Sequence, residues 1–185
     1  GAGGGPYFGP ALEYLDLACD WADARKLQVV IVLQAAPGGQ NGHASCGRHD
    51  PSWHWHSWRI AETIEVIRRL AERFRDRRCV TGLQILDSPS EDIPADSLIE
   101  FYETAIATVR GAGMSSDNVT VILPVHPETK VAPFVDRWHS AIDVYDQVCF
   151  DFDYRKPPVV TSASSWLPIP EVRARNSYHF FLVHD

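Results

Sequence analysis

The chain has 185 residues, of which 45% are hydrophobic and 22% are charged, a composition typical of a globular domain with a sizeable core. The formal net charge of −7 excludes a general affinity for nucleic acid or anionic membranes. No run approaches the about 20 apolar residues that cross a bilayer. The first ten residues, GAGGGPYFGP, lack the basic and apolar regions of a signal peptide.

The predicted elements alternate between helix and strand. Apolar residues recur at helical spacing in three segments, and short apolar runs separate them. The run over 28–33 is continuous, which favours a strand buried on both faces of a parallel sheet. In chain order we expect a helix over 12–22, strand 28–33, helix 60–74, strand 80–86, a helix from Ser97 to about 111, strand 118–125, a short helix around 134–138, and strands 147–154 and 178–183.

This alternation predicts a parallel sheet with right-handed crossovers. The sheet could be an open, doubly wound one or part of a (β/α)₈ barrel. No glycine-rich phosphate loop follows any strand, which argues against a nucleotide-binding sheet. Polar and aromatic residues gather after strand ends, where barrels build their sites. We therefore expect a TIM-barrel-like α/β fold.

Two further patterns have simple structural interpretations. The four cysteines (Cys19, Cys46, Cys79 and Cys149) form no CxxC motif, and Cys79 and Cys149 adjoin apolar runs that predict buried core positions. The basic stretch over 68–78 predicts the solvated face of a helix, with a docking surface for an acidic partner as the alternative. The cysteines leave the cellular compartment open.

Four segments occur in the order GPY…EYLDLACDWADARKLQVVIVLQAAPGGQNG, GLQILDSP, VTVILPV and QVCFDFDY, within residues 6–154. This order resembles glycoside hydrolase family 5, nearest the fungal-type exo-1,3-β-glucanases. The resemblance implies a (β/α)₈ barrel of secretory or extracellular ancestry without a cofactor. Its most specific piece is the family loop Leu-His-Gly-Ala-Pro-Gly-Ser-Gln-Asn-Gly after the third strand, matched by Leu33, Ala36, Pro37, Gly38, Gln40, Asn41 and Gly42.

The resemblance also shows where this chain departs from the catalytic pattern. Gln34 stands at the family's histidine, and Ser88 stands at the acid/base glutamate of Asn-Glu-Pro. Phe152 replaces the histidine of His-x-Tyr, of which only Tyr154 is retained. Asp185 would stand at the nucleophile position on the seventh strand. These substitutions predict a catalytically degenerate domain.

Asp87 is the acidic residue next to the lost glutamate. Successive side chains on a strand point to opposite faces, so a shift by one position is expected to turn Asp87 away from the cleft. An active β-glucan hydrolase with relocated carboxylates is the alternative hypothesis, and Asp87 and Asp185 are its candidates.

The length adds a separate expectation. An eightfold barrel needs about 200 residues or more. Matched to the family, residues 1–185 form a single partial barrel domain with about strands 3 to 7. We therefore expect that the chain begins partway through a larger product, or that other protein chains cover the open edge of the barrel.

The loop over 43–58 is rich in His, Trp and Cys. The histidines 43, 49, 54 and 56 with Cys46 could hold zinc, but their spacing matches no standard closed site, and we predict no metal there. Tryptophan faces suit sugar rings, so a carbohydrate-binding rim is a further hypothesis. Its candidate residues are Gln40, Asn41, Trp53, Trp55 and Tyr154, and its ligand would be a β-glucan oligosaccharide. The leading hypothesis is a pseudoenzyme used as a structural or interaction subunit.

Overall fold

The computed structural model describes residues 11–47, 49–125, 137 and 146–152. Its elements are α1 (Ala11–Arg25), β1 (Val29–Val32), two short 3₁₀ turns (Ala44–Cys46 and Trp55–Ser57), α2 (Ile60–Phe74), β2 (Val80–Gln84), α3 (Ala95–Gly111), β3 (Thr120–Val125) and β4 (Val148–Phe152). The predicted element at 178–183 lies outside the described residues, and so does the one around 134–138 apart from residue 137.

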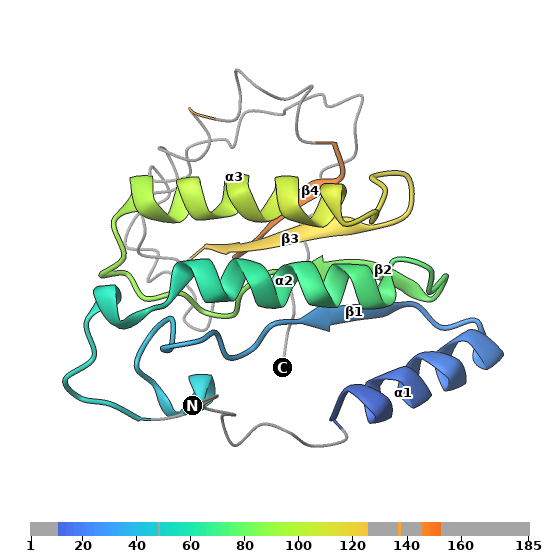
Figure 1. Cartoon of the computed structure of the whole chain (residues 1–185), viewed down its shortest axis with the longest axis horizontal. Helices are drawn as coiled ribbons and strands as arrows, with labels where there is room; N and C mark the ends of the chain where they lie inside the picture. The colour runs from blue at the N-terminus through green and yellow to red at the C-terminus, as the bar shows by residue number, and fades with distance from the viewer. Residues whose placement is uncertain (1–10, 48, 126–136, 138–145, 153–185) are drawn as a thin grey trace, which may run out of the picture.

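The four strands form one sheet in the order β1-β2-β3-β4, and every neighbouring pair is parallel. Helices α2 and α3 lie side by side on one face of this sheet (Figure 1). The predicted α/β class with a parallel sheet, as in part of a TIM-like barrel, is confirmed. Within the described residues the sheet does not close.

Helix α2 packs on the sheet through one apolar stripe. Ile67, Ala71 and Phe74 of the predicted apolar stripe are buried together with Thr63, whereas Ile60 and Ile64 of that stripe are only partly buried. In the sheet, Ile31 of β1 pairs with Leu83 of β2, and Leu83 pairs with Val121 of β3, so these three buried residues form a row across the strands. This row beneath the helices is the centre of the core.

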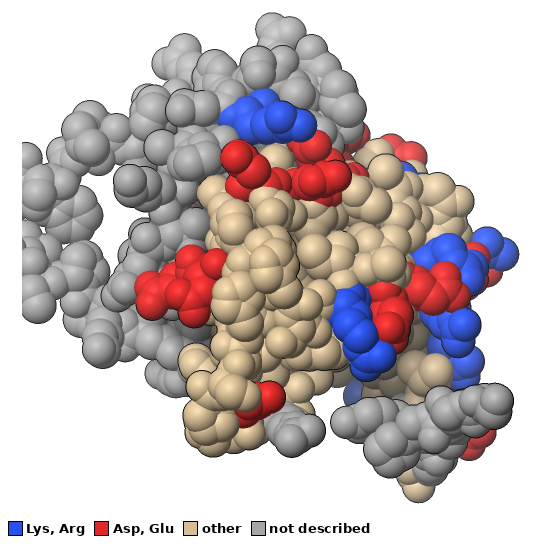
Figure 2. Space-filling model, turned by 60° about the vertical axis from the view of Figure 1, so that its left-hand side comes forward, with Lys and Arg blue, Asp and Glu red and all other residues tan. Residues whose placement is uncertain are grey.

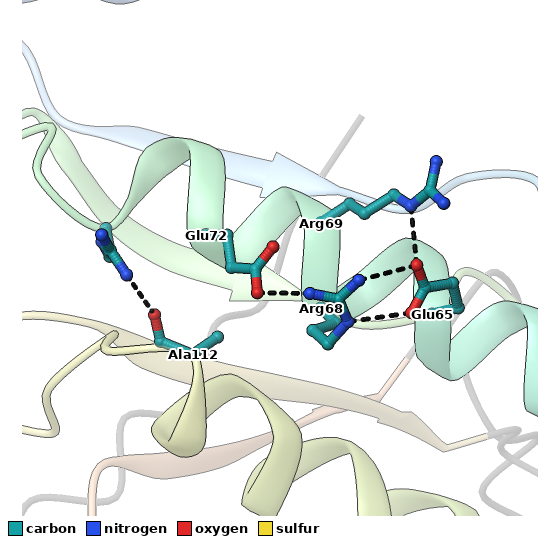
Figure 3. Close-up of polar contacts among 6 residues, drawn as sticks. Glu65, Arg68, Arg69, Glu72 and Ala112 are labelled. Atoms are coloured by element: carbon teal, nitrogen blue, oxygen red, sulfur yellow. Dashed lines mark hydrogen bonds and ion pairs between the residues drawn. The ribbon is translucent and has the colours of Figure 1, made fainter.

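The opposite face of α2 bears the basic stretch. Arg68 forms ion pairs with Glu65 and Glu72, and Arg69 also pairs with Glu65 (Figure 3). These side chains are exposed, and the neighbouring arginines hold the pKa of Glu65 down at about 2. Figure 2 shows lysine and arginine side chains interleaved with carboxylates on the face in view, without a separate basic patch. Arg68 and Arg69 therefore lie on a solvated helix face, as predicted, whereas Arg73 and Arg77 form ion pairs with Asp16 and Asp20 of α1.

Helix α3 begins earlier than the sequence predicted. Its first residue is Ala95, and the N–H of Leu98 donates to the carbonyl of Pro94 at 3.0 Å, so Ser97 lies inside the helix. The expected start at Ser97 was wrong because Pro94, with φ fixed at −55°, already presents its carbonyl to the first turn.

Strand β1 also differs from the prediction. Its side chains were expected to be buried on both faces, but Val30 and Val32 are 49% and 44% exposed, whereas Ile31 between them is buried. The reason is that α2 and α3 cover only one face, and among the described strands β1 stands at the edge of the sheet (Figure 1).

Arg110 joins the amino ends of β3 and β4 to the end of α3. Its guanidinium donates to the backbone carbonyls of Met114, Val119, Asp146 and Gln147 at 2.8–3.2 Å. Burial lowers the pKa of Arg110, which is consistent with a guanidinium held mainly by carbonyl dipoles. Arg110 therefore links the segments that precede β3 and β4 to each other.

Candidate functional site at the carboxyl ends of β1 and β2

The loop that follows β1 wraps tightly against residues 53–59. The Arg59 N–H donates to the Pro37 carbonyl at 2.9 Å. Gly38 has a φ of +81°, and a Cβ atom placed on it would lie 2.0 Å from the Ser57 carbonyl oxygen. Gly42 also has a positive φ, of +67°, and a Cβ atom placed on it would lie 2.5 Å from the Trp53 Cβ. The glycines of the APGGQNG motif are therefore required by backbone conformation and close approach.

Gln40 lies at the centre of this loop and is fully buried. Its Oε1 accepts the Ala36 N–H at 3.1 Å. Its Nε2 donates to the carbonyl oxygens of Gln34 and Asp87, both at 2.7 Å. One amide thus joins the carboxyl end of β1 to the segment that follows β2.

Asn41 repeats this connection one residue later. Its Nδ2 donates to the Ser88 carbonyl at 2.8 Å, and its Oδ1 accepts the His43 N–H at 2.9 Å. The Ser90 N–H donates to the Gln40 carbonyl at 3.0 Å. Loops 34–43 and 87–90 therefore form one rigid rim. Both Gln40 and Asn41 were predicted to contact substrate, and here their amides bind backbone.

Ser88 occupies the position of the expected acid/base. It has a positive φ of 42°, which is uncommon outside glycine and marks a constrained backbone. Its Oγ donates to the Asp87 Oδ1 at 3.3 Å, and both residues are partly exposed. Regular strand structure ends at Gln84, three residues before Asp87. The alternation of side chains along a strand therefore cannot be used to decide where Asp87 points.

The remaining positions that the resemblance assigned to the catalytic centre are only partly within the described residues. Gln34 is exposed directly after β1. Phe152 is the last residue of β4, so it stands at the same edge of the parallel sheet as Gln34 and Ser88. Tyr154 and Asp185 lie outside the described residues.

The two predicted tryptophans of the rim, Trp53 and Trp55, differ in their contacts. Trp53 is partly buried, and its Nε1–H donates to the Gly39 carbonyl at 3.1 Å. Trp55 is partly exposed, with the His56 ring centroid 3.7 Å from its own, and His56 stacks on exposed His54 at 4.9 Å. Trp55 also packs against the hydrophobic core, and it forms an aromatic cluster on the rim with His54 and His56.

The histidines and cysteine of this loop do not converge on one point. Among the described residues, no group of three or more His, Cys, Asp or Glu side chains could hold a metal ion. Cys46 is buried, and its Sγ donates to the His43 carbonyl at 3.0 Å. The zinc alternative therefore receives no support from the described part of the loop.

Two open hollows among the described residues lie away from this rim. One is lined by α1 with Leu27, and the other lies at the end of α3 near Met114. None of the described helices is long and apolar enough to cross a membrane.

Sequence reasoning missed the bridging role of Gln40 and Asn41. It assigned them to substrate because the family places polar residues at this rim. The available signal was their position between glycines, since an amide within a tight loop is well placed to satisfy backbone groups. Which backbone groups they reach depends on the β2 loop, 47 residues away in the chain.

A parallel sheet with polar loops gathered at the carboxyl ends of its strands defines an α/β domain of the barrel-forming type. The chain is similar to several fungal proteins named glucan 1,3-beta-glucosidase. It is 36% identical over 123 residues to the probable glucan 1,3-beta-glucosidase A of Emericella nidulans, covering 65% of this chain and 30% of that protein.

Two further relatives give the same result. Identity is 40% over 108 residues to the probable glucan 1,3-beta-glucosidase A of Aspergillus fumigatus, covering 57% of this chain and 26% of that protein. Identity to the glucan 1,3-beta-glucosidase of Blumeria graminis is 32% over 114 residues, which cover 60% of this chain and 26% of that protein. No protein-family model matches the chain. The predicted resemblance to exo-1,3-β-glucanases is confirmed, and the chain spans less than a third of the length of these relatives.

Proposed function

We propose that this chain is a non-catalytic relative of the glucan 1,3-beta-glucosidases, a pseudoenzyme that serves as a structural or interaction subunit. The proposal is supported by Ser88 in the loop after β2, at the position that the family resemblance assigns to the acid/base glutamate. The rim around it is rigid, because Gln40 and Asn41 hold the carbonyls of Asp87 and Ser88.

The chemistry of a retaining glycosidase explains why this residue matters. Such an enzyme needs two carboxyl groups about 5–5.5 Å apart, one to protonate the leaving oxygen and one to attack the sugar. A serine hydroxyl does not titrate in the useful range, and general acid catalysis contributes about 10²–10⁴ in rate. With Gln34 in place of histidine, the rim also lacks a group that would orient the substrate.

The interaction half of the proposal is supported by the exposed apolar surface. Large contiguous apolar patches on a protein surface mark contacts with other molecules. Here the exposed large hydrophobic side chains belong to α1, β1 and the turn between them: Leu12, Tyr14, Leu17, Trp21, Leu27, Val30 and Val32. Other protein chains at this edge are the proposed partners.

The alternative of an active hydrolase is favoured by one observation. The Asp87 carboxylate lies within 3.3 Å of the Ser88 hydroxyl, so an acidic group is still present beside the former acid/base position. The other acids of this segment, Glu91 and Asp92, are exposed, and Asp92 accepts from the Ser90 hydroxyl. Asp87 is therefore the residue to test.

The experiment compares hydrolysis of 1,3-β-glucan oligosaccharides and aryl β-glucosides by the full chain, by Asp87→Asn and by Glu91→Gln. We expect no release of glucose above the buffer background from any of the three proteins. Glu91→Gln is the matched control for removing a carboxylate from the same loop. Turnover by the unmodified chain would contradict the proposal, and its loss in Asp87→Asn alone would identify Asp87 as the relocated acid.

A second candidate function, binding of β-glucan oligosaccharides, is favoured by the aromatic cluster that partly exposed Trp55 forms with exposed His54 and His56. Stacking of a sugar on Trp55 would change its fluorescence, because the indole ring would leave water. We expect a saturable change with millimolar 1,3-β-glucan oligosaccharide that disappears in Trp55→Ala. Trp21→Ala, which removes an exposed tryptophan on α1, serves as the control. An unchanged response in Trp55→Ala would exclude this cluster as the binding site.

A further inference from the structure

The structure holds two cysteines in contact at a place far from the candidate site. Cys19 lies in the middle of α1 and is fully buried, and Cys79 immediately precedes β2 and is 5% exposed. The Cys79 Sγ lies 3.5 Å from the Cys19 carbonyl oxygen. We propose that Cys19 and Cys79 form a disulfide in an oxidising environment, which fastens α1 to the sheet.

Both thiols are buried, and the Cys79 side chain lies against the Cys19 backbone. Burial raises the pKa of the Cys79 thiol to about 11, and a side-chain hydrogen bond with Cys19 contributes to that increase. The two cysteines are 60 residues apart in the chain. A bond between them would therefore close a long loop and restrict the unfolded chain considerably.

Helix α1 is the element that gains from such a bond. Its polar contacts with α2 and the turn after it are ion pairs at the surface, which contribute little in water: Arg73 of α2 with Asp16, and Arg77 of the turn with Asp16 and Asp20. Leu12, Tyr14, Leu17 and Trp21 on the same helix are exposed. With few buried contacts, α1 is expected to open locally more readily than α2 or α3.

This opening gives a thiol access to an oxidant. The Cys79 thiolate attacks a small disulfide such as oxidised glutathione, forming a mixed disulfide and releasing one glutathione thiolate. The Cys19 thiolate then attacks the Cys79 sulfur and releases the second glutathione. The protein loses two protons and two electrons, and oxidised glutathione takes them up to become two reduced glutathione molecules. Because the pKa of Cys79 is raised, little thiolate is present near neutral pH, and the first step becomes faster as the pH rises.

The test uses the full chain, reduced and then equilibrated with oxidised glutathione at mildly alkaline pH. Free thiols are blocked with N-ethylmaleimide, and the protein is analysed by intact mass and peptide mapping. We expect a Cys19–Cys79 bond with Cys46 and Cys149 blocked, and a thermal midpoint raised by roughly 5–15 °C relative to the reduced chain.

Matched variants separate this bond from other oxidation. Cys149→Ser, which removes another buried cysteine, should still form the bond. Cys19→Ser and Cys19→Ala should form none and show no rise of the midpoint on oxidation. The proposal is overturned if all four cysteines of the native chain remain free, if Cys79 stops at the glutathione adduct, or if the internal bond involves Cys46 instead.

Discussion

Gln40→Ala is expected to lower the free energy of unfolding by about 3–5 kcal/mol, because buried backbone groups left without partners cost roughly 1–3 kcal/mol each. The substitution removes the partner of the Ala36 N–H and of the carbonyls of Gln34 and Asp87. It also leaves a cavity at a fully buried position. Urea unfolding followed by circular dichroism measures the loss.

Gln34→Ala is the matched control for Gln40→Ala, since it truncates the same residue type at an exposed position six residues earlier. We expect it to change stability by less than about 0.5 kcal/mol. Gln40→Glu should also be destabilising, because a carboxylate cannot donate to the two carbonyls. A loss below about 1 kcal/mol in Gln40→Ala would show that water replaces the amide and that the loops are not held by it.

Gly38→Ala is expected to cost more than about 3 kcal/mol and to disturb the loop over 34–42, since overpacking and backbone strain each contribute about 1–3 kcal/mol. The added methyl group would lie 2.0 Å from the Ser57 carbonyl oxygen and 3.0 Å from the Arg59 nitrogen. Both neighbours are backbone atoms, so the loop itself must move to admit the methyl group.

Gly47→Ala separates the two causes. Gly47 also has a positive φ, at +97°, but a Cβ atom there would meet nothing within 4 Å. Its substitution should therefore cost only the conformational strain, about 1–2 kcal/mol. The difference between the two variants in thermal or urea unfolding measures the close packing of the loop against Ser57. Equal losses would mean that the packing contributes nothing beyond strain.

Much of the fold was predictable because local periodicity decides it. The predicted helix over 60–74 coincides with α2, since its apolar stripe recurs at helical spacing along the whole segment. The burial of β1 was not predictable in the same way. Whether Val30 and Val32 are covered depends on which elements lie on that face of the sheet, and the four apolar residues of β1 contain no information about it.

For the site, sequence reasoning identified the loop but not its contacts. The motif predicted a functional rim after β1, and the structure places that rim against the β2 loop. The prediction for Asp87 assumed that strand alternation continued to residue 87, but the regular strand ends at Gln84, and Ser88 has a positive φ. Such a departure from regular backbone geometry arises from long-range hydrogen bonds, and local patterns do not reveal it.

The hydrogen bonds of Gln40 and Asn41 have a consequence for how this rim can evolve. On the β2 side they recognise only the carbonyls of residues 87 and 88, which every amino acid possesses. A mutation that exchanges the side chain at position 88 therefore leaves the acceptors of these hydrogen bonds in place. Selection for a folded protein alone would retain the glycines and amides of this loop, so their presence records descent and says nothing of whether a catalyst survives.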